Sequence, residues 1–567
     1  MGREPASNNP DRAPRWCLAA SAVAALLGLG LVAEQADRLS ATYDEVAYLR
    51  VAARWWRSGE QAEITRMGSP LTFWKVQQGP TLWALDRLGR SSWIDDPIAH
   101  QAELLPVVRL GGAWIWLVAL AIAAAWARRL HGPRAMAMAA TLFALGPNLL
   151  AHGALATMEI PLVAGTAAMG FAFWTFLSRG DRRAFWLSAA IGGLAFSCKF
   201  TTVVFPPIFA LIWAVDLWLA RDRARGVAAS LRRVVAKVVP GMALYGLVMV
   251  AANLCVTGFA TLPLSARDGS HPIAAGKLPP MLEVWAGRLI DASYPQDWVG
   301  FATQAMHQRN GGPSYLLGER RLTGWWHYYL VALAVKLPIA AWFLLIVRAI
   351  QVRAAPGRSG DRGWMMPVII ITFLVLAMAG SRRNYGFRYL LPLAVPAIVW
   401  LSGLAEAARW PRRLGWLGVL GVVAATVAIR PHELAYFNEL AGGPIGGRRV
   451  LADSNLDWGQ GAKSLADLQR SRPEFRDLTL YSFGDTDPAR YGVVGRRIVF
   501  DALRDPVDLP PALMAETAYL GVSASLQYGP WGPLGYFRRL DEIRPVAYTA
   551  DTTIAIYRSA DVFGDRP

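Results

Sequence analysis

Charged residues are scarce in this sequence. Only 17% of its 567 residues are Asp, Glu, Lys or Arg, against roughly 25% in soluble domains. Hydrophobic residues make up 54%, and acidic residues are so outnumbered by basic ones that the formal net charge is +17. This composition excludes a chain built only of soluble domains and predicts an integral membrane protein.

Cysteine is scarcer still. Cys17, Cys198 and Cys255 all lie in or beside apolar segments, and the polar C-terminal region has none. No disulfide framework is therefore indicated. Many transporters contain internal repeats, and this chain shows none.

Long apolar runs, by contrast, are abundant. Eleven segments approach the ~20 residues that a helix needs to cross a bilayer. The first follows Arg3, Arg12 and Arg15; we interpret it as an uncleaved span, because further spans follow and no cleavage site precedes Glu34. The predicted spans are 16–34, 106–127, 136–152, 159–177, 184–198, 200–220, 238–258, 326–347, 364–380, 388–407 and 414–430.

The basic residues gather on alternate connections between these spans. With a cytoplasmic N-terminus, the inner segments hold 22 of the 58 Lys and Arg but 5 of the 41 Asp and Glu, which leaves 36 of each sign elsewhere. Short cytoplasmic loops collect Lys and Arg, so this orientation is the predicted one. The excess positive charge thus lies entirely in the predicted cytoplasmic segments, where membrane orientation explains it. No nucleic-acid partner is therefore indicated. The inner segments are 1–15, 128–135, 178–183, 221–237, 348–363 and 408–413.

The outer face then carries most of the polar sequence. We predict a transmembrane domain over 1–430, with outer loops 35–105 and 259–325 and with helices near 44–57 and 71–89. Residues 431–567 alternate strand-like runs with a helical run at 460–470, which predicts a small outer α/β domain. The expected fold is thus a polytopic α-helical membrane protein with about eleven spans and a C-terminal α/β domain. The strand-like runs are 449–453, 478–483, 517–523, 545–549 and 553–558.

Acidic residues stand at two outer positions. Asp44 and Glu45 follow the first span by about ten residues; they are either ordinary loop acids or carboxylates at a cavity mouth, able to act as a general base. Glu159 opens the fourth span within Thr157–Pro161. It either faces the helix dipole behind a Thr cap or faces Asp44 across a cavity.

Basic residues appear where the positive-inside tendency disfavours them. Arg382, Arg383 and Arg388 share one short outer connection, and guanidinium groups bind phosphate bidentately. Lys199, at an outer tip, either snorkels to the headgroups or holds a phosphate. Lys336 lies two turns inside an apolar span, so it needs an anionic partner or a wet cavity. Interfacial anchoring is the alternative for the arginines.

Taken in order, these residues resemble a known family. Asp44-Glu45, LATMEIP at 155–161, GLAFSCK at 193–199 and RYLLP at 388–392 resemble motifs of the dolichyl-phosphate-mannose protein mannosyltransferases and the lipid A aminoarabinose transferases, which are family 39-like, C-type membrane glycosyltransferases. Four further motifs resemble those of a bacterial branch of this superfamily: GPSYLLG at 312–318, Trp325-Trp326 with Lys336, YFNELAGGP at 436–444 and DSNLDWGQ at 453–460. His327, Leu330 and Gly461 depart from this pattern.

The resemblance implies a glycosyltransferase that takes a sugar from a polyprenyl-phosphate donor at the outer face. It implies Asp44, with Glu45 and Glu159 as companions, for catalysis. Lys199, Arg383, Arg388 and Lys336 are then candidates for the donor phosphate. Three further residues of these motifs are candidates for contacts to the sugar or the acceptor: Tyr389, Trp325 and Asp457.

The predicted mechanism uses one base and no nucleophile, which favours inversion at the anomeric carbon. No cofactor is indicated, and metal dependence is left open. The predicted partners are the donor, membrane lipid and an acceptor that is protein, glycan or lipid, in a bacterial cytoplasmic membrane. A transporter is the alternative, although the unusual charges cluster at one face rather than at the midplane.

Overall fold

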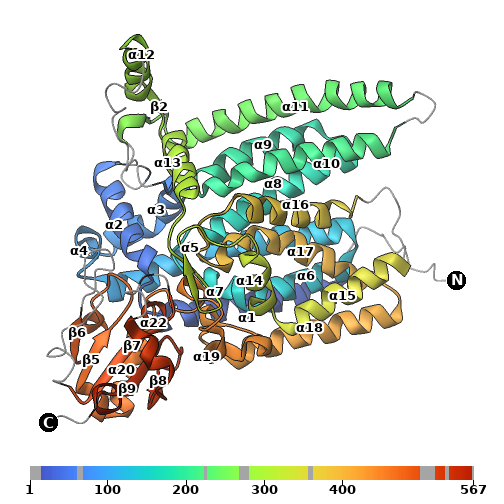
Figure 1. The fold of residues 1–567 in the computed structure, drawn as a ribbon. Helices are drawn as coiled ribbons and strands as arrows, with labels where there is room; N and C mark the ends of the chain where they lie inside the picture. Colours follow the sequence, from blue (N-terminus) through green and yellow to red (C-terminus); the bar gives the residue numbers. More distant parts are fainter. Residues whose placement is uncertain are drawn as a thin grey trace.

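The computed structural model describes residues 14–60, 65, 68–221, 226–266, 280–354, 362–498, 517–529, 531 and 536–564. In these ranges the chain forms a body of long, roughly parallel helices. Shorter helices and a small sheet gather at one end of that body (Figure 1). The predicted combination of a helical body with a C-terminal α/β region is confirmed.

Seven helices in the described residues are long and apolar enough to cross a membrane. The chain is therefore a multi-pass membrane protein. These helices are α1 (Arg15–Arg38), α5 (Gln101–Leu130), α8 (Glu159–Arg179), the 3₁₀ turn η2 (Phe200–Val204) with α10 (Phe205–Leu219), α11 (Val227–Val256), α17 (Ala394–Ser402) with the flanking 3₁₀ turns η5 (Phe387–Leu393) and η6 (Gly403–Glu406), and α18 (Arg409–Ile429).

Two further apolar helix pairs are sharply bent. α6 (Pro133–Ala144) meets α7 (Pro147–Gly153) at 61°, and α14 (Tyr328–Lys336) meets α15 (Ile339–Ala354) at 104°. Pro147 begins α7, and Pro338 lies between α14 and α15. Proline has no N–H to donate and its ring clashes with the preceding turn, so a helix ends before it. Side-chain amides bind the carbonyls freed at the second break: Asn148 donates to the Lys336 carbonyl at 2.7 Å, and Asn438 to the Leu337 carbonyl at 2.8 Å.

Two shorter helices cover the remaining predicted spans: α9 (Arg182–Phe196) and α16 (Met365–Gly380), of which α16 is apolar. Each of the eleven predicted spans thus coincides with a helix or a bent pair. Seven to nine of them meet the length and hydropathy expected of a full crossing. The helical positions are confirmed, while the number of crossings stays a prediction.

The first long loop, 35–105, forms the helices expected of it, α2 (Tyr43–Ser58) and α3 (Thr72–Arg87), with α4 (Ser91–Asp95) after them. These helices, the described parts of the second long loop, 259–325, and the sheet lie at one end of the body, opposite the end where α10 stops and α11 begins (Figure 1). The second loop contains β1 (Thr261–Pro263), α12 (Pro280–Asp291), β2 (Ser293–Pro295), α13 (Gln296–Asn310), β3 (Ser314–Leu316) and β4 (Glu319–Arg321).

The C-terminal sheet has the strand order β6-β5-β7-β9-β8. β5 pairs in parallel with both β6 and β7, while β9 pairs antiparallel with β7 and β8. α20 (Ala462–Ser471) confirms the predicted helix at 460–470. The strands are β5 (Leu478–Tyr481), β6 (Arg496–Ile498), β7 (Tyr519–Ser523), β8 (Ala547–Tyr548) and β9 (Ile554–Arg558).

The predicted strand at 449–453 is wrong. After α19 (Gly443–Gly447), the Val450 and Leu451 N–H groups both donate to the Gly447 carbonyl, so the chain continues as a turn. Leu451 is fully buried in the main helical core rather than in the sheet. The apolar character of this run therefore reflects packing against the membrane body.

Candidate active site

A cavity of about 590 Å³ opens where α2, the start of α8, the turn after α9, α13 and residues 383–389 meet. Most predicted site residues line it, and one lining residue, Asp485, comes from the C-terminal region. The lining residues are Tyr43, Asp44, Ala47, Tyr48, Arg50, Val51, Gly68, Ser69, Pro70, Met158, Glu159, Lys199, Phe200, Thr201, Gln304, His307, Arg383, Tyr385, Arg388, Tyr389 and Asp485.

Asp44 reaches this cavity because of how α2 begins. Thr42 caps the helix, and the Glu45 carboxylate reaches back to accept from the Thr42 N–H at 3.0 Å, which forms a capping box. The Tyr43 N–H donates to the Trp458 carbonyl at 2.8 Å. Asp44, in the first helical turn, is thereby turned toward the cavity with 24% of its side chain exposed.

Glu45, expected beside Asp44 as a catalytic acid, does not line the cavity. Its carboxylate is fully buried and accepts from Arg109 Nη2 at 2.7 Å and from the Ala156 N–H at 2.8 Å. Burial alone would raise the pKa of Glu45, but Arg109 and the backbone N–H donors more than reverse this and hold the pKa below its usual range. Glu45 thus joins α2 to α5 and to the segment before α8.

Two carboxylates and two cations form a network inside the cavity. Asp44 Oδ2 accepts from Arg388 Nη1 at 2.8 Å, and Lys199 Nζ donates to Glu159 Oε1 at 2.9 Å. Arg388 Nη1 also lies 3.6 Å from Glu159 Oε1. Lys199 Nζ stands 4.6 Å from the centre of the Tyr389 ring. Glu159 lines the same cavity as Asp44 and also stands in the first turn of α8, so its position agrees with both interpretations.

Arg388 is held on several sides. Its guanidinium lies 4.2 Å from the centre of the Trp458 ring, close enough for a cation–π contact. The preceding residue is fixed by a bond from the Phe387 N–H to Asn455 Oδ1 at 2.8 Å. Arg388 Nε is buried with no hydrogen-bond partner among the described residues. Nη1 of the guanidinium therefore binds Asp44, and its buried Nε is an unused donor.

The other two arginines of this connection differ from each other. Arg383 lines the cavity, its Nε donating to the Gly311 carbonyl at 2.8 Å. Arg382 is exposed and donates to the Arg309 carbonyl at 3.1 Å. Arg383 and Arg388 are thus placed to meet a ligand in the cavity, and Arg382 is not.

Lys336, a candidate for the donor phosphate, lies outside the cavity lining. Its Nζ is buried and donates to the Asn455 carbonyl at 2.6 Å and the Leu434 carbonyl at 3.2 Å. The sequence predicted either an anionic partner or a wet cavity for this charge; the structure gives it two carbonyl oxygens. Lys336 thereby fixes the segment that supports Arg388.

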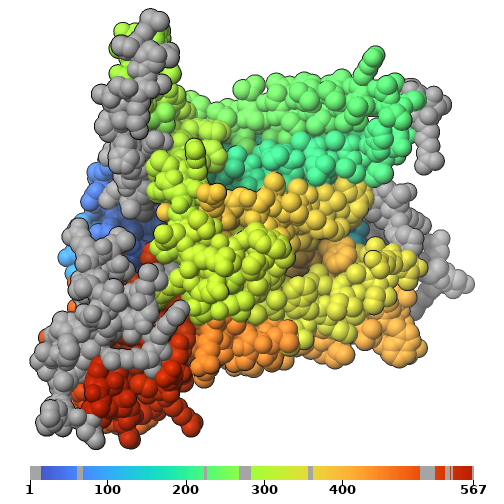
Figure 2. Space-filling model, viewed as in Figure 1, coloured from blue at the N-terminus to red at the C-terminus, as the bar shows by residue number. Residues whose placement is uncertain are grey.

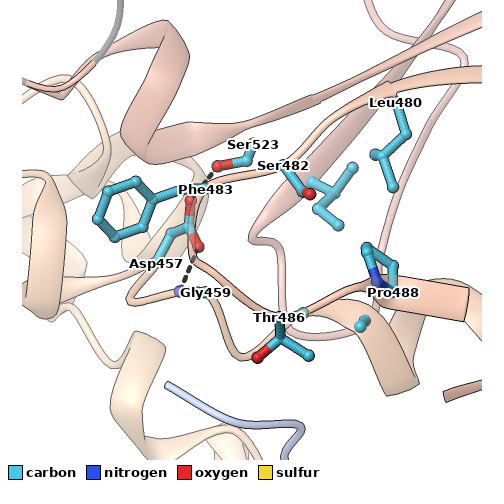
Figure 3. A pocket seen from close by; sticks show the side chains of 11 residues that line it. Asp457, Gly459, Leu480, Ser482, Phe483, Thr486, Pro488 and Ser523 are labelled. Atoms are coloured by element: carbon cyan, nitrogen blue, oxygen red, sulfur yellow. Dashed lines mark hydrogen bonds between the residues drawn. The ribbon is translucent and has the colours of Figure 1, made fainter. Parts of the chain in front are cut away.

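Trp325 and Asp457 also lie elsewhere. Trp325 is buried, and its backbone N–H donates to Asn384 Oδ1 at 2.7 Å. Asp457 sits in a small pocket at the ends of β5 and β7, where it accepts from the Ser523 hydroxyl at 2.5 Å and the Ser525 N–H at 2.8 Å (Figure 3). Burial raises the pKa of Asp457 to about 6. Neither residue lines the cavity: Asp457 binds backbone N–H groups, and Trp325 is held through its own backbone by Asn384.

Sequence reasoning missed the role of residues 453–460 as a whole. This segment bonds to the start of α2 through the Trp458 and Gln460 carbonyls, which accept from the Tyr43 and Ser40 N–H groups. It bonds to the Arg388 connection through Asn455. The segment therefore sets Asp44 and Arg388 relative to each other. The run DSNLDWGQ was the signal, but only its resemblance to a family marked it.

Arg50, Gln304, His307 and Asp485 were missed as lining residues. They come from the two long loops and from the C-terminal region, where polar residues are ordinary, so no sequence pattern singles them out. Within the described ranges, no group of three or more His, Cys, Asp or Glu side chains is arranged to hold a metal ion.

Comparison with known proteins adds one family match. Residues 102–249 match the model of the dolichyl-phosphate-mannose-protein mannosyltransferase family. No curated protein matches the chain in sequence. The matched segment contains Glu159 and Lys199, two of the four charged residues of the network.

Solved structures of similar shape share little sequence with the chain. ArnT from Cupriavidus metallidurans bound to undecaprenyl phosphate is 14% identical with a TM-score of 0.49, and the match covers 98% of this chain and 100% of ArnT. Archaeal oligosaccharyltransferase AglB from Archaeoglobus fulgidus, in complex with an inhibitory peptide and a dolichol-phosphate, is 12% identical with a TM-score of 0.45, over 97% of this chain and 75% of AglB. The resemblance predicted from the sequence is thus confirmed for residues 102–249, which match the dolichyl-phosphate-mannose-protein mannosyltransferase family.

Proposed function

We propose that this protein is a membrane glycosyltransferase that moves a sugar from a polyprenyl-phosphate donor to an acceptor hydroxyl. The observation that carries the proposal is the network of Asp44, Glu159, Lys199 and Arg388 in one cavity at the end of the spanning helices. A transfer from a lipid phosphate needs a base for the acceptor and cations for the leaving phosphate. This network supplies both.

Asp44 is the proposed base. Its carboxylate takes the proton of the acceptor hydroxyl while that oxygen forms its bond to the anomeric carbon. The bond between the anomeric carbon and the phosphate oxygen breaks, and polyprenyl phosphate leaves as an anion. Glu159, the second carboxylate of the network, is paired with Lys199, so Asp44 acts alone as the base and a single displacement with inversion is the expected course.

Arg388 is the proposed contact for the leaving phosphate. Its Nη1 is engaged by Asp44, whereas its buried Nε has no partner among the described residues. Arg and phosphate pair through two parallel bonds, so the unoccupied edge suits a phosphate oxygen. Lys199 and Arg383, on other walls of the cavity, are the proposed supporting cations.

An apolar cavity adjoins this site. It has a volume of about 310 Å³ and is lined by Phe387, Leu390 and Leu391, which flank Arg388 and Tyr389, together with residues of α14, α15 and α16. The molecular surface is hollowed between these helices (Figure 2). We propose that part of the polyprenyl chain lies here, because its apolar surface is then removed from water and its phosphate is placed at Arg388.

The broken helices do not favour a transporter. Transporters use such breaks to coordinate ions or charged substrates near the midplane. Here the breaks at Gly146 and Pro338 line the apolar cavity, and none of its lining residues is ionisable. Lys336, beside the second break, binds two backbone carbonyls, and the four charged residues of the network lie in the other cavity, at the end of the bundle.

The enzyme and the transporter are separated by following a radiolabelled polyprenyl-phosphate sugar in proteoliposomes. The proposal expects the label to leave the lipid, to appear on an acceptor or as free sugar, and the polyprenyl phosphate to remain. Movement of intact labelled lipid across the bilayer without cleavage would contradict it. The acceptor class, the inversion and the outward orientation of the site are part of the same proposal.

A further inference from the structure

Four aromatic rings form a row at the mouth of the charged cavity. Tyr43 stacks on Phe483 with ring centres 5.6 Å apart, Phe483 on Trp531 at 6.4 Å, and Trp531 contacts Tyr385 at 5.6 Å. Tyr43 precedes Asp44, and Tyr385 stands three residues before Arg388. The row therefore runs beside the Asp44–Arg388 pair, and both its end members line the cavity.

The C-terminal region supplies the middle of this row. Phe483 follows β5, and Asp485, two residues later, is exposed and lines the cavity. Trp531 is tied back by its indole N–H, which donates to Asp453 Oδ2 at 3.2 Å. Phe483 and Trp531 are only partly buried, and Tyr43 is 44% exposed. Their rings are thus held in place while part of their surface faces water.

Acidic groups surround the row on the same side. Asp44 lies at one end and Asp485 at the rim, and Asp453 holds Trp531 from below. Asp453 has a φ of +60°, a strained backbone for a residue other than glycine. The cations Lys199 and Arg388 are already paired with Glu159 and Asp44. Arg383 also reaches the row, its guanidinium 5.7 Å from the centre of the Tyr385 ring. The carboxylates therefore give the row hydrogen-bond acceptors for a ligand's hydroxyl groups.

We propose that the aromatic row, Tyr43, Phe483, Trp531 and Tyr385, is the acceptor subsite and that its ligand is a neutral pyranose. A pyranose with equatorial hydroxyls has a flat face of C–H groups that packs on aromatic rings, and its hydroxyls donate to carboxylates such as Asp485. One hydroxyl would then point toward Asp44. The inference rests on the proposed function and adds to it the class of acceptor and a role for the C-terminal region.

The test uses the purified full-length chain in proteoliposomes with a radiolabelled polyprenyl-phosphate sugar. Methyl β-glucopyranoside and a serine-containing peptide are offered as acceptors, and sugar released to water is measured in parallel. We expect label on the pyranoside in excess of the peptide. In Phe483→Ala and Trp531→Ala the ratio of label on pyranoside to label in water should fall about five- to tenfold, the size of one lost ring contact.

Three controls keep the test specific. Phe483→Tyr should restore the ratio, because it keeps the ring. Trp285→Ala removes an exposed Trp of α12 that is not part of the row and should leave the ratio at the wild-type value. Thermal unfolding of each variant identifies any that fail to fold, and Phe483→Leu then replaces an unfolded Phe483→Ala.

The outcomes separate this proposal from the one on which it rests. If wild-type protein releases no sugar to any acceptor or to water, the proposed function fails. If it releases sugar but labels the peptide in preference to the pyranoside, or if the ratio in folded Phe483→Ala and Trp531→Ala equals that of wild type, the acceptor subsite is wrong while the glycosyltransferase stands.

Discussion

Asp44 and Arg388 are 344 residues apart in the chain, and their side chains meet at 2.8 Å. The sequence predicted five of the charged residues that line the cavity, namely Asp44, Glu159, Lys199, Arg383 and Arg388, because charge stands out beside apolar spans. It could not assign Glu45, since neighbouring residues of a helix point about 100° apart and the register of α2 decides which one faces the cavity.

Arg388→Lys should weaken turnover of the polyprenyl-phosphate donor, or its binding, more than Arg382→Lys. Lysine lacks the planar fork that binds Asp44 and that, in the proposed function, also binds the donor phosphate. The loss of one charge-assisted bond corresponds to about 1.5–3 kcal/mol. Arg382 is the matched control, because it is exposed on the same connection. The account would be contradicted if Arg388→Lys and Arg388→Ala kept the wild-type rate and donor affinity. The connection would then serve as a membrane anchor.

Glu433 offers a test of buried charge outside the spans. It is 1% exposed, neither carboxylate oxygen has a partner in the described part of the chain, and burial raises its pKa to about 7. Between about pH 4.5 and 7 the unfolded chain has lost this proton while the native protein keeps it. Stability should therefore fall as pH rises through this window.

Glu433→Gln should remove that fall, because glutamine mimics the protonated acid at every pH. The free energy of unfolding of the variant should exceed that of wild type by on the order of 1–3 kcal/mol at pH 8 and by little at pH 4.5. Thermal unfolding in detergent at the two pH values measures this. A stability difference between variant and wild type that does not change with pH would show that Glu433 is ionised in the native protein.

Among the elements, the helices were predictable and the segment joining them to the sheet was not. Apolar runs of about 20 residues predict spans through one physical requirement, the thickness of the bilayer. Residues 453–460 have no such periodicity; their structure comes from contacts with Ser40, Tyr43 and Phe387, far away in sequence. The strand predicted at 449–453 was wrong for the same reason. The apolar side chains of this run pack against the helical core rather than in the sheet.

Trp458→Leu should lower turnover about tenfold at temperatures where the variant is folded, because Arg388 loses the ring beneath its guanidinium. Trp458→Phe keeps a ring and should recover part of this loss. Trp126→Leu is the control: Trp126 is a fully buried Trp of α5, so its loss should reduce stability without changing turnover per folded molecule. Equal turnover in folded Trp458→Leu and wild type would show that Trp458 only fills space.

At the scale of the whole molecule, the elements outside the spans gather at one end, as the distribution of basic residues predicted. Which face of the membrane this end meets is a prediction from charge alone. Val494→Cys, in the C-terminal region, should react with an impermeant thiol reagent in intact cells, whereas Val227→Cys should not. Both positions are exposed, and Cys255, which is exposed too, is first changed to Ala. Labelling at 227 with protection at 494 would invert the orientation.

The central claim is that Asp44 acts as the base in sugar transfer from a polyprenyl phosphate. The most direct measurement compares donor binding and single-turnover transfer in wild type and Asp44→Asn, both folded and inserted. Asparagine keeps the size and polarity of the side chain but cannot take the proton, so transfer should fall about 10²–10⁴-fold while the donor still binds. Near-normal transfer by Asp44→Asn would contradict the account.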